Sequence, residues 1–195
     1  MLKPRNSTVY FALASAILLS SIGMSPPQAF SATASDGVKL KSKAPDLELQ
    51  DDQGNPYKLS DHIGKSKVVV FFYMSDKTTN CTDEVCCFRD DYEKFRQKGA
   101  DVIGISPDTV ADQSTFRKEH KVQFALLSDP GSKVSNQWVL DGGNLPPKTR
   151  KTFIIDEKGN IVKAYTAKDE EYKKIVDKTL AGLGSFTGGG PMVSP

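Results

Sequence analysis

The sequence contains few of the side chains that hold metals or build disulfide frameworks. Its 195 residues include three cysteines, two histidines and one tryptophan. We expect His62 and His120 to be surface residues rather than metal ligands, and Trp138 to belong to the core. No two cysteines have the Cys-x-x-Cys spacing on which most thiol–disulfide oxidoreductases rely. No metal or other cofactor is expected.

The sequence also lacks an excess of charge of one sign. The net charge is +2, and removal of Lys3 and Arg5 leaves a neutral chain, since +2 minus 2 gives 0. A neutral domain with interspersed charges does not present the basic surface that binds nucleic acid. The chain is 38% hydrophobic, which suits a single globular domain with a sizeable core.

The N-terminus carries an apolar run that is short for a membrane span. Lys3 and Arg5 precede the uncharged apolar segment 9–24, and residues 32–34 read Ala-Thr-Ala, an A-x-A cleavage site. A spanning helix needs about 20 apolar residues. We therefore favour a cleaved signal peptide at 1–34 over an uncleaved membrane anchor. The domain is then exported to a periplasm or a thylakoid-type lumen, or secreted, without stable membrane association after cleavage.

Strand and helix patterns alternate through residues 35–183, and the Gly- and Pro-rich tail 184–195 is expected to be flexible. This order predicts an α/β fold with a central mixed sheet flanked by helices. The Lys-rich segment 168–178 is interpreted as a solvated helix face. The expected elements are a hairpin at 46–60, strands at 67–73, 101–106, 124–129, 150–156 and 161–166, and helices at 80–98, 108–119, 132–138 and 168–180. Ile175, Val176, Thr179 and Leu180 are the expected inner side of the last helix.

All three cysteines fall at the start of the helix expected at 80–98. With Asn80 as N-cap, Cys81 lies in the first turn, where free N–H groups and the helix dipole favour a thiolate. Helical periodicity places Cys81 on one stripe with Val85, Phe88, Tyr92 and Phe95, the expected buried face. Cys86 is about 7.5 Å further along the helix axis. A disulfide needs Cα atoms within about 7 Å, so Cys81 and Cys86 can bond only if the first turns unwind.

Several segments together resemble the peroxiredoxins of the bacterioferritin-comigratory, or Q, subfamily. The segment 73–90, YMSDKTTNCTDEVCCFRD, is similar to their active-site sequence P-x-x-x-T-x-x-C, which has a Glu three residues and a second cysteine five residues after the first. Segments 43–61, 99–108, 126–130 and 150–156 resemble other family segments in the same order. One departure is Met74, which stands where the family has its proline.

The resemblance implies a thioredoxin-like fold and a thiol-dependent peroxidase that reduces hydrogen peroxide and organic hydroperoxides. It assigns Cys81 as the peroxidatic cysteine, Cys86 as the resolving cysteine, and Thr78 and Arg150 as groups that bind the thiolate and the peroxide. Glu84 either holds Arg150 or favours the helix end. A thioredoxin-like donor would reduce the resulting intramolecular disulfide, and we expect a monomer.

Three other interpretations of the cysteines stay open. The chain could be an exported thiol–disulfide oxidoreductase of the same fold, although it has no Cys-x-x-Cys. It could be a copper carrier, although it lacks the Cys-x3-Cys and the placed histidine of such proteins. The cysteines could also be small buried hydrophobic residues. Cys87 is expected to be structural or accessory, or a substitute for Cys86.

Overall fold

The computed structural model describes residues 40–74, 79–138, 150–167 and 171–184, and all of them belong to one unit of the chain, Ala34–Pro195. The expected signal peptide at 1–34 and most of the expected tail lie outside the described residues. None of the helices in the described ranges has the length and apolar character needed to cross a membrane.

The fold is built on a seven-stranded mixed sheet with the strand order β2-β1-β5-β4-β3-β6-β7. Strands β3, β4 and β5 are parallel to one another, and the remaining pairs are antiparallel. The strands are β1 (Glu48–Asp51), β2 (Pro56–Lys58), β3 (Lys67–Phe72), β4 (Ala100–Ser106), β5 (Ala125–Ser128), β6 (Arg150–Ile155) and β7 (Ile161–Ala167). The predicted hairpin, strands and mixed sheet are therefore confirmed.

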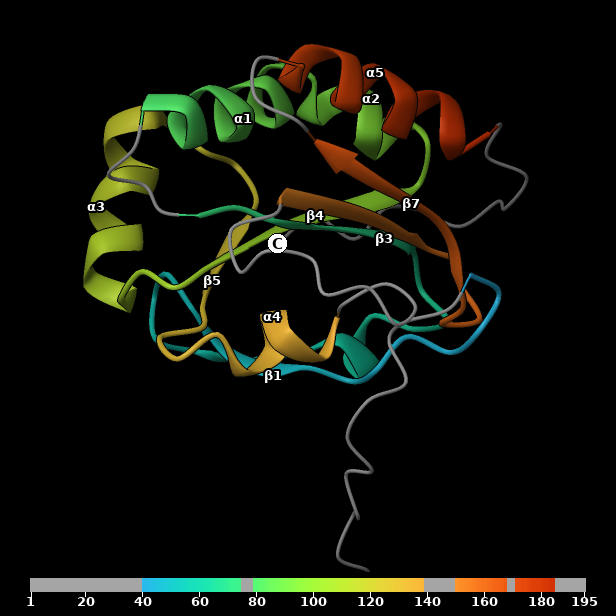
Figure 1. Cartoon of the computed structure of the whole chain (residues 1–195), viewed down its shortest axis with the longest axis horizontal. Coiled ribbons are helices and arrows are strands. Elements are labelled where there is room, and N and C mark those ends of the chain that lie inside the picture. Colours follow the sequence, from blue (N-terminus) through green and yellow to red (C-terminus); the bar gives the residue numbers. More distant parts are fainter. Residues whose placement is uncertain (1–39, 75–78, 139–149, 168–170, 185–195) are drawn as a thin grey trace, which may run out of the picture. The chain divides into compact units, whose positions relative to one another are not determined.

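Helices cover both faces of this sheet (Figure 1). Helices α1, α2 and α5 lie over one face, and α4 lies on the other. Helix α3 contributes Phe116 to the same apolar cluster as α1 and α5. The helices are α1 (Thr79–Asp90), α2 (Tyr92–Gln97), α3 (Val110–His120), α4 (Lys133–Gln137) and α5 (Tyr172–Gly182), with a 3-10 turn, η1, at Leu59–Asp61.

Alternation along the strands gives the sheet two apolar cores. The α1 and α5 face buries Phe71, Phe88 and Val176, and the α4 face buries Phe72 and Trp138. Successive strand side chains point to opposite faces, so the continuous apolar run of β3 supplies both cores. The predicted burial of Trp138 and of the inner side of the last helix is confirmed.

The helix expected at 80–98 is instead two helices, which meet at Asp91. The backbone tightens there, since Lys94 N–H donates to the Asp91 carbonyl three residues earlier, at 2.9 Å. The Asp91 carboxylate is buried and binds Lys94 at 2.6 Å and Lys173 of α5 at 2.8 Å. Burial alone would raise the pKa of Asp91, but the hydrogen bonds from these two lysines hold it below its usual value. Gly99, at φ 67°, follows α2 and ends it as expected.

All four expected helix starts differ from the observed ones by one to four residues, and α4 begins at Lys133 rather than at residue 132. Helix α1 begins at Thr79, so Asn80 is inside it and is not its N-cap. Thr109 caps α3 by accepting a hydrogen bond from Asp112 N at 3.2 Å, whereas Asp108 accepts one from the Ser106 hydroxyl at 2.8 Å. Helix α5 begins at Tyr172 rather than at residue 168. Local hydrogen bonds from Ser, Thr and Asp side chains compete with the backbone ladder at such positions.

Candidate active site

The first turn of α1 follows the carboxyl end of β3, one of the central strands. Cys81 is the third residue of that helix, which begins at Thr79. In open α/β sheets, functional sites gather beyond the carboxyl ends of parallel strands. The backbone thus places Cys81 where the sequence predicts it, at a helix start. Thr78 and the side chain of Cys81 lie outside the described residues.

Glu84 and Arg150 form a buried contact between α1 and β6. Arg150 Nε is 3.4 Å from Glu84 Oε2, and the exposed fractions of the two side chains are 3% and 0%. Glu84 is expected either to hold Arg150 or to favour the helix end, and its side chain contacts Arg150. Glu84 Oε1 and Oε2 have no hydrogen-bond partner within the described part of the chain.

Burial controls the protonation of Glu84. Loss of water contact raises the pKa of Glu84 and the positive charge of Arg150 offsets part of this rise, so that the pKa is about 8. At neutral pH the carboxyl group is therefore largely protonated. A protonated Glu84 does not neutralise the guanidinium of Arg150, and arginine does not lose its proton in proteins. The positive charge of Arg150 can therefore act on a neighbouring anion.

Tyr172, the first residue of α5, is a further contact of Arg150. Its hydroxyl accepts a hydrogen bond from Arg150 Nη1 at 2.9 Å, and its ring centroid lies 5.0 Å from the guanidinium carbon. The side chain is 6% exposed. The interpretation of segment 168–178 as a solvated face is therefore wrong at Tyr172. A single aromatic residue among charged neighbours was the available signal.

Cys86 and Cys87 are half-buried free thiols on the middle of α1. Burial raises the pKa of Cys86, Arg89 lowers it in part, and the nearby Asp90 and Asp83 raise it further. Burial and Asp90 likewise raise the pKa of Cys87. Cys87 packs against the apolar cluster under α1, as does Met74, the residue in the position of the family proline. Both thiols are therefore largely protonated at neutral pH in this conformation.

Comparisons with known proteins agree with one another on the family. The family model described as AhpC/TSA family matches residues 40–164. "Peroxiredoxin Q, chloroplastic" of Sedum lineare is 42% identical over 152 residues, which cover 76% of this chain and 80% of the relative. The protein of the same name from Gentiana triflora is 37% identical and covers 87% of this chain and 78% of the relative. The chain is a peroxiredoxin of the AhpC/TSA family.

Solved structures of peroxiredoxins share this fold. The peroxidoxin BcpB of Mycobacterium tuberculosis is 34% identical, with a TM-score of 0.66, and covers 75% of this chain and 96% of its own. Peroxiredoxin Q of Xanthomonas campestris is 28% identical, with a TM-score of 0.61, and covers 70% and 89%. The predicted thioredoxin fold and Q-type resemblance are therefore confirmed. The chain is an enzyme, a thiol peroxidase.

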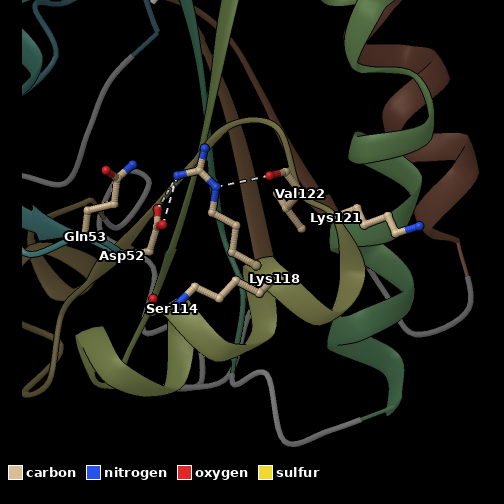
Figure 2. Close-up of a pocket in the computed structure, with 7 residues that line it drawn as sticks. Asp52, Gln53, Ser114, Lys118, Lys121 and Val122 are labelled. Carbon is tan, nitrogen blue, oxygen red and sulfur yellow. Dashed lines mark hydrogen bonds and ion pairs between the residues drawn. The ribbon is translucent and has the colours of Figure 1, made fainter.

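This peroxiredoxin also has a surface cavity of about 410 Å³ beside α3 (Figure 2). It is lined mainly by Asp52, Arg117, Lys118 and Lys121. Arg117 donates to both carboxylate oxygens of Asp52 at 2.9 Å and to the Val122 carbonyl at 3.1 Å. The central charges of this cavity thus bind each other, and none of its lining residues is a predicted site residue.

Proposed function

We propose that this enzyme reduces hydrogen peroxide and organic hydroperoxides with Cys81 as the peroxidatic cysteine. The Cys81 thiolate attacks one peroxide oxygen, and the O–O bond breaks. The products are a sulfenic acid on Cys81 and, after the leaving oxygen takes up a proton, water or an alcohol. The observation that carries the proposal is the Glu84–Arg150 contact, because it joins the helix that bears Cys81 to a buried cation.

Arg150 is the proposed electrostatic partner of the Cys81 thiolate and of the peroxide. Cys81 precedes Glu84 by three residues in one helix, and positions three residues apart are neighbours on a helix surface. A cation held at Glu84 is thus held at the turn that carries Cys81. A nearby guanidinium stabilises a thiolate, and its fork of N–H donors can bind peroxide oxygens. Thr78 is proposed to donate a hydrogen bond to the thiolate or the peroxide.

Cys86 is the proposed resolving cysteine. Its sulfur attacks the Cys81 sulfenic acid, a disulfide forms and water leaves. Helix α1 runs without a break from Thr79 to Asp90, so it contains both cysteines. At about 1.5 Å of rise per residue their separation exceeds disulfide reach, and the first turns of α1 must open. A thioredoxin-like dithiol donor then reduces the disulfide.

The proposed compartment is outside the cytosol, since residues 1–34 have the pattern of an export signal. The names of the relatives place those proteins in chloroplasts. The choice between a periplasm and a thylakoid-type lumen follows from the host, and the mature domain is proposed to act as a monomer.

Variants in which one cysteine at a time is replaced by serine test this proposal. Peroxide consumption with thioredoxin and its reductase is compared for the wild type, Cys81→Ser, Cys86→Ser and Cys87→Ser. We expect Cys81→Ser to abolish turnover and sulfenic acid formation. Cys86→Ser should form sulfenic acid but recycle poorly, whereas Cys87→Ser is the matched control and should turn over normally. Continued turnover by Cys81→Ser would refute the proposal, and a defect confined to Cys87→Ser would reassign the resolving residue.

The thiol chemistry of Cys86 adds a pH signature to that test. Because the thiolate is the attacking species, its fraction grows about tenfold per pH unit below its pKa. Disulfide closure after a peroxide pulse should therefore accelerate between pH 7 and 8, as followed by stopped-flow fluorescence. A closure rate that does not change with pH would indicate that α1 opening, and not thiolate supply, limits the step.

A further inference from the structure

In the described part of the chain, side chains from α1 and α5 contact the guanidinium of Arg150. Glu84 approaches Nε from α1, and the hydroxyl of Tyr172 accepts from Nη1 at the start of α5. The Glu84 contact at 3.4 Å is a charge proximity and not a hydrogen bond, because neither carboxylate oxygen of Glu84 has a hydrogen-bond partner in the described part of the chain. The hydroxyl of Tyr172 therefore supplies a directional contact that restricts the rotation of the guanidinium. The Tyr172 ring adds a surface on which the guanidinium lies, at 5.0 Å from the ring centroid.

Burial gives the Tyr172 contact its importance. Arg150 is 3% exposed and Tyr172 is 6% exposed, so little water is available to replace a lost hydroxyl. A hydrogen bond to a charged group is stronger than one between neutral groups, and leaving its donor unpaired costs more. Glu84, largely protonated at neutral pH because of its burial, constrains Arg150 less firmly than an ionised carboxylate does.

We propose that Tyr172 is a positioning residue, which aims the guanidinium of Arg150 at the reaction centre through its hydroxyl and its ring. The inference rests on the proposed role of Arg150 and adds a residue from α5, far from Cys81 in the sequence. It makes the rate of Cys81 oxidation sensitive to α5, an element that carries no residue of the proposed chemistry.

The chain supplies a matched control in Tyr165 of β7. Tyr165 packs against the apolar cluster on the same face of the sheet, and its hydroxyl donates to the Lys178 carbonyl of α5 at 3.0 Å. It therefore also joins α5 to the sheet through a tyrosine hydroxyl. Its hydroxyl bonds to a main-chain carbonyl rather than to Arg150. If a tyrosine hydroxyl only attached α5 to the sheet, its removal from Tyr172 or from Tyr165 should have the same effect on Cys81 oxidation.

The test measures three quantities for Tyr172→Phe, Tyr172→Leu and Tyr165→Phe in the full mature enzyme. They are the second-order rate constant of Cys81 oxidation by hydrogen peroxide, the Cys81 thiol pKa from the pH profile of alkylation, and Tm. We expect Tyr172→Phe to slow oxidation about tenfold and to raise the thiol pKa, since one charge-assisted bond is lost. Tyr172→Leu, which also loses the ring, should slow it further, and Tyr165→Phe should stay within about twofold.

Two outcomes separate failure of this inference from failure of the proposed function. If Tyr172→Phe and Tyr172→Leu lower Tm but leave the rate and the thiol pKa at wild-type values, Tyr172 only packs α5 and the inference is wrong. Arg150→Ala, measured alongside, tests the underlying function. A slow Arg150→Ala with unaffected Tyr172 variants overturns only the inference, whereas an unaffected Arg150→Ala overturns both. Tyr172→Phe keeps the ring, so it remains informative even if Tyr172→Leu does not fold.

Discussion

Arg150 and Lys151 are adjacent buried cations on β6 with opposite surroundings. Arg150 is 3% exposed and Lys151 is 6% exposed. Because strand side chains alternate, Arg150 shares a face with Ile154 under α1 and α5, and Lys151 shares the other face with Phe153. Arg150 contacts Glu84 and Tyr172, whereas no carboxylate in the described ranges forms an ion pair with Lys151.

The difference shows that partners, and not burial alone, make a buried charge useful. Burial lowers the pKa of Lys151, because an unpaired ammonium loses hydration without compensation. The guanidinium of Arg150 stays charged and is oriented by side chains from two helices. On the α1 and α5 face of the sheet, neighbouring side chains orient the cation Arg150. On the opposite face, Lys151 is buried without an ion-pair partner in the described ranges. Substituting one member of this pair, or one partner, at a time separates the two surroundings.

Among substitutions that keep a similar side chain at these positions, the largest effect is expected when Arg150 keeps its charge but loses its shape. Arg150→Lys replaces the planar fork by a point charge that cannot bind Glu84 and Tyr172 together. We expect kcat/KM for hydrogen peroxide to fall about 100-fold, which corresponds to about 2.7 kcal/mol of transition-state stabilisation. The matched variant Lys151→Arg, on the opposite face, should lose less than about threefold. Equal losses in the two variants would show that the position of the guanidinium does not matter.

A smaller effect is expected from replacing the titratable carboxyl group of Glu84, the partner of Arg150, by an amide. The pKa of Glu84 is raised from 4.5 to about 8 in the folded protein, so between these values the native state binds the proton more tightly than the unfolded state. Stability therefore falls as pH rises through that window, by at most about 1.4 kcal/mol per pH unit. Glu84→Gln should remove this slope, as measured by urea unfolding from pH 5 to 8. A variant that keeps the wild-type slope would place the titrating group elsewhere.

The smallest effect is expected for Lys151. Its pKa is lowered by burial, so the unfolded state binds the proton more tightly and this group's contribution to stability increases as pH rises toward 10.5. Lys151→Met removes the desolvation cost and should stabilise the domain by about 1 kcal/mol at pH 7. Equilibrium unfolding at pH 7 and pH 10 tests both the rise of wild-type stability with pH and the stabilisation by Lys151→Met. Destabilisation by Lys151→Met would mean that the ammonium has a favourable role.

The strands and the approximate start of the helix that carries Cys81 could be predicted because local sequence determines them. The continuous apolar run of β3 has to be buried on both faces, and a helix after such a strand follows from periodicity. Arg150 and Glu84 entered the prediction through resemblance, and Tyr172 was missed. No local pattern shows that the first residue of α5 meets the first residue of β6, because the packing of distant segments brings them together.

The break at Asp91 has the same kind of cause. Residues 80–98 have a helical pattern throughout, but the buried carboxylate of Asp91 binds Lys173 from α5. That partner is 82 residues away in the sequence. Tertiary contacts thus decide where α1 ends, and local propensity does not.

The most direct test of this account compares Arg150→Ala with Lys151→Ala. The measured quantity is the second-order rate constant with which hydrogen peroxide converts Cys81 to sulfenic acid in a single turnover, followed by stopped flow and confirmed by mass spectrometry. Removing a charge-assisted contact that forms with the transition state costs about 100-fold or more, so Arg150→Ala should be slowed at least that much. Lys151→Ala should react within about twofold of the wild type. An Arg150→Ala variant that oxidises Cys81 at the wild-type rate, or a Lys151→Ala variant that is slowed equally, would contradict the account.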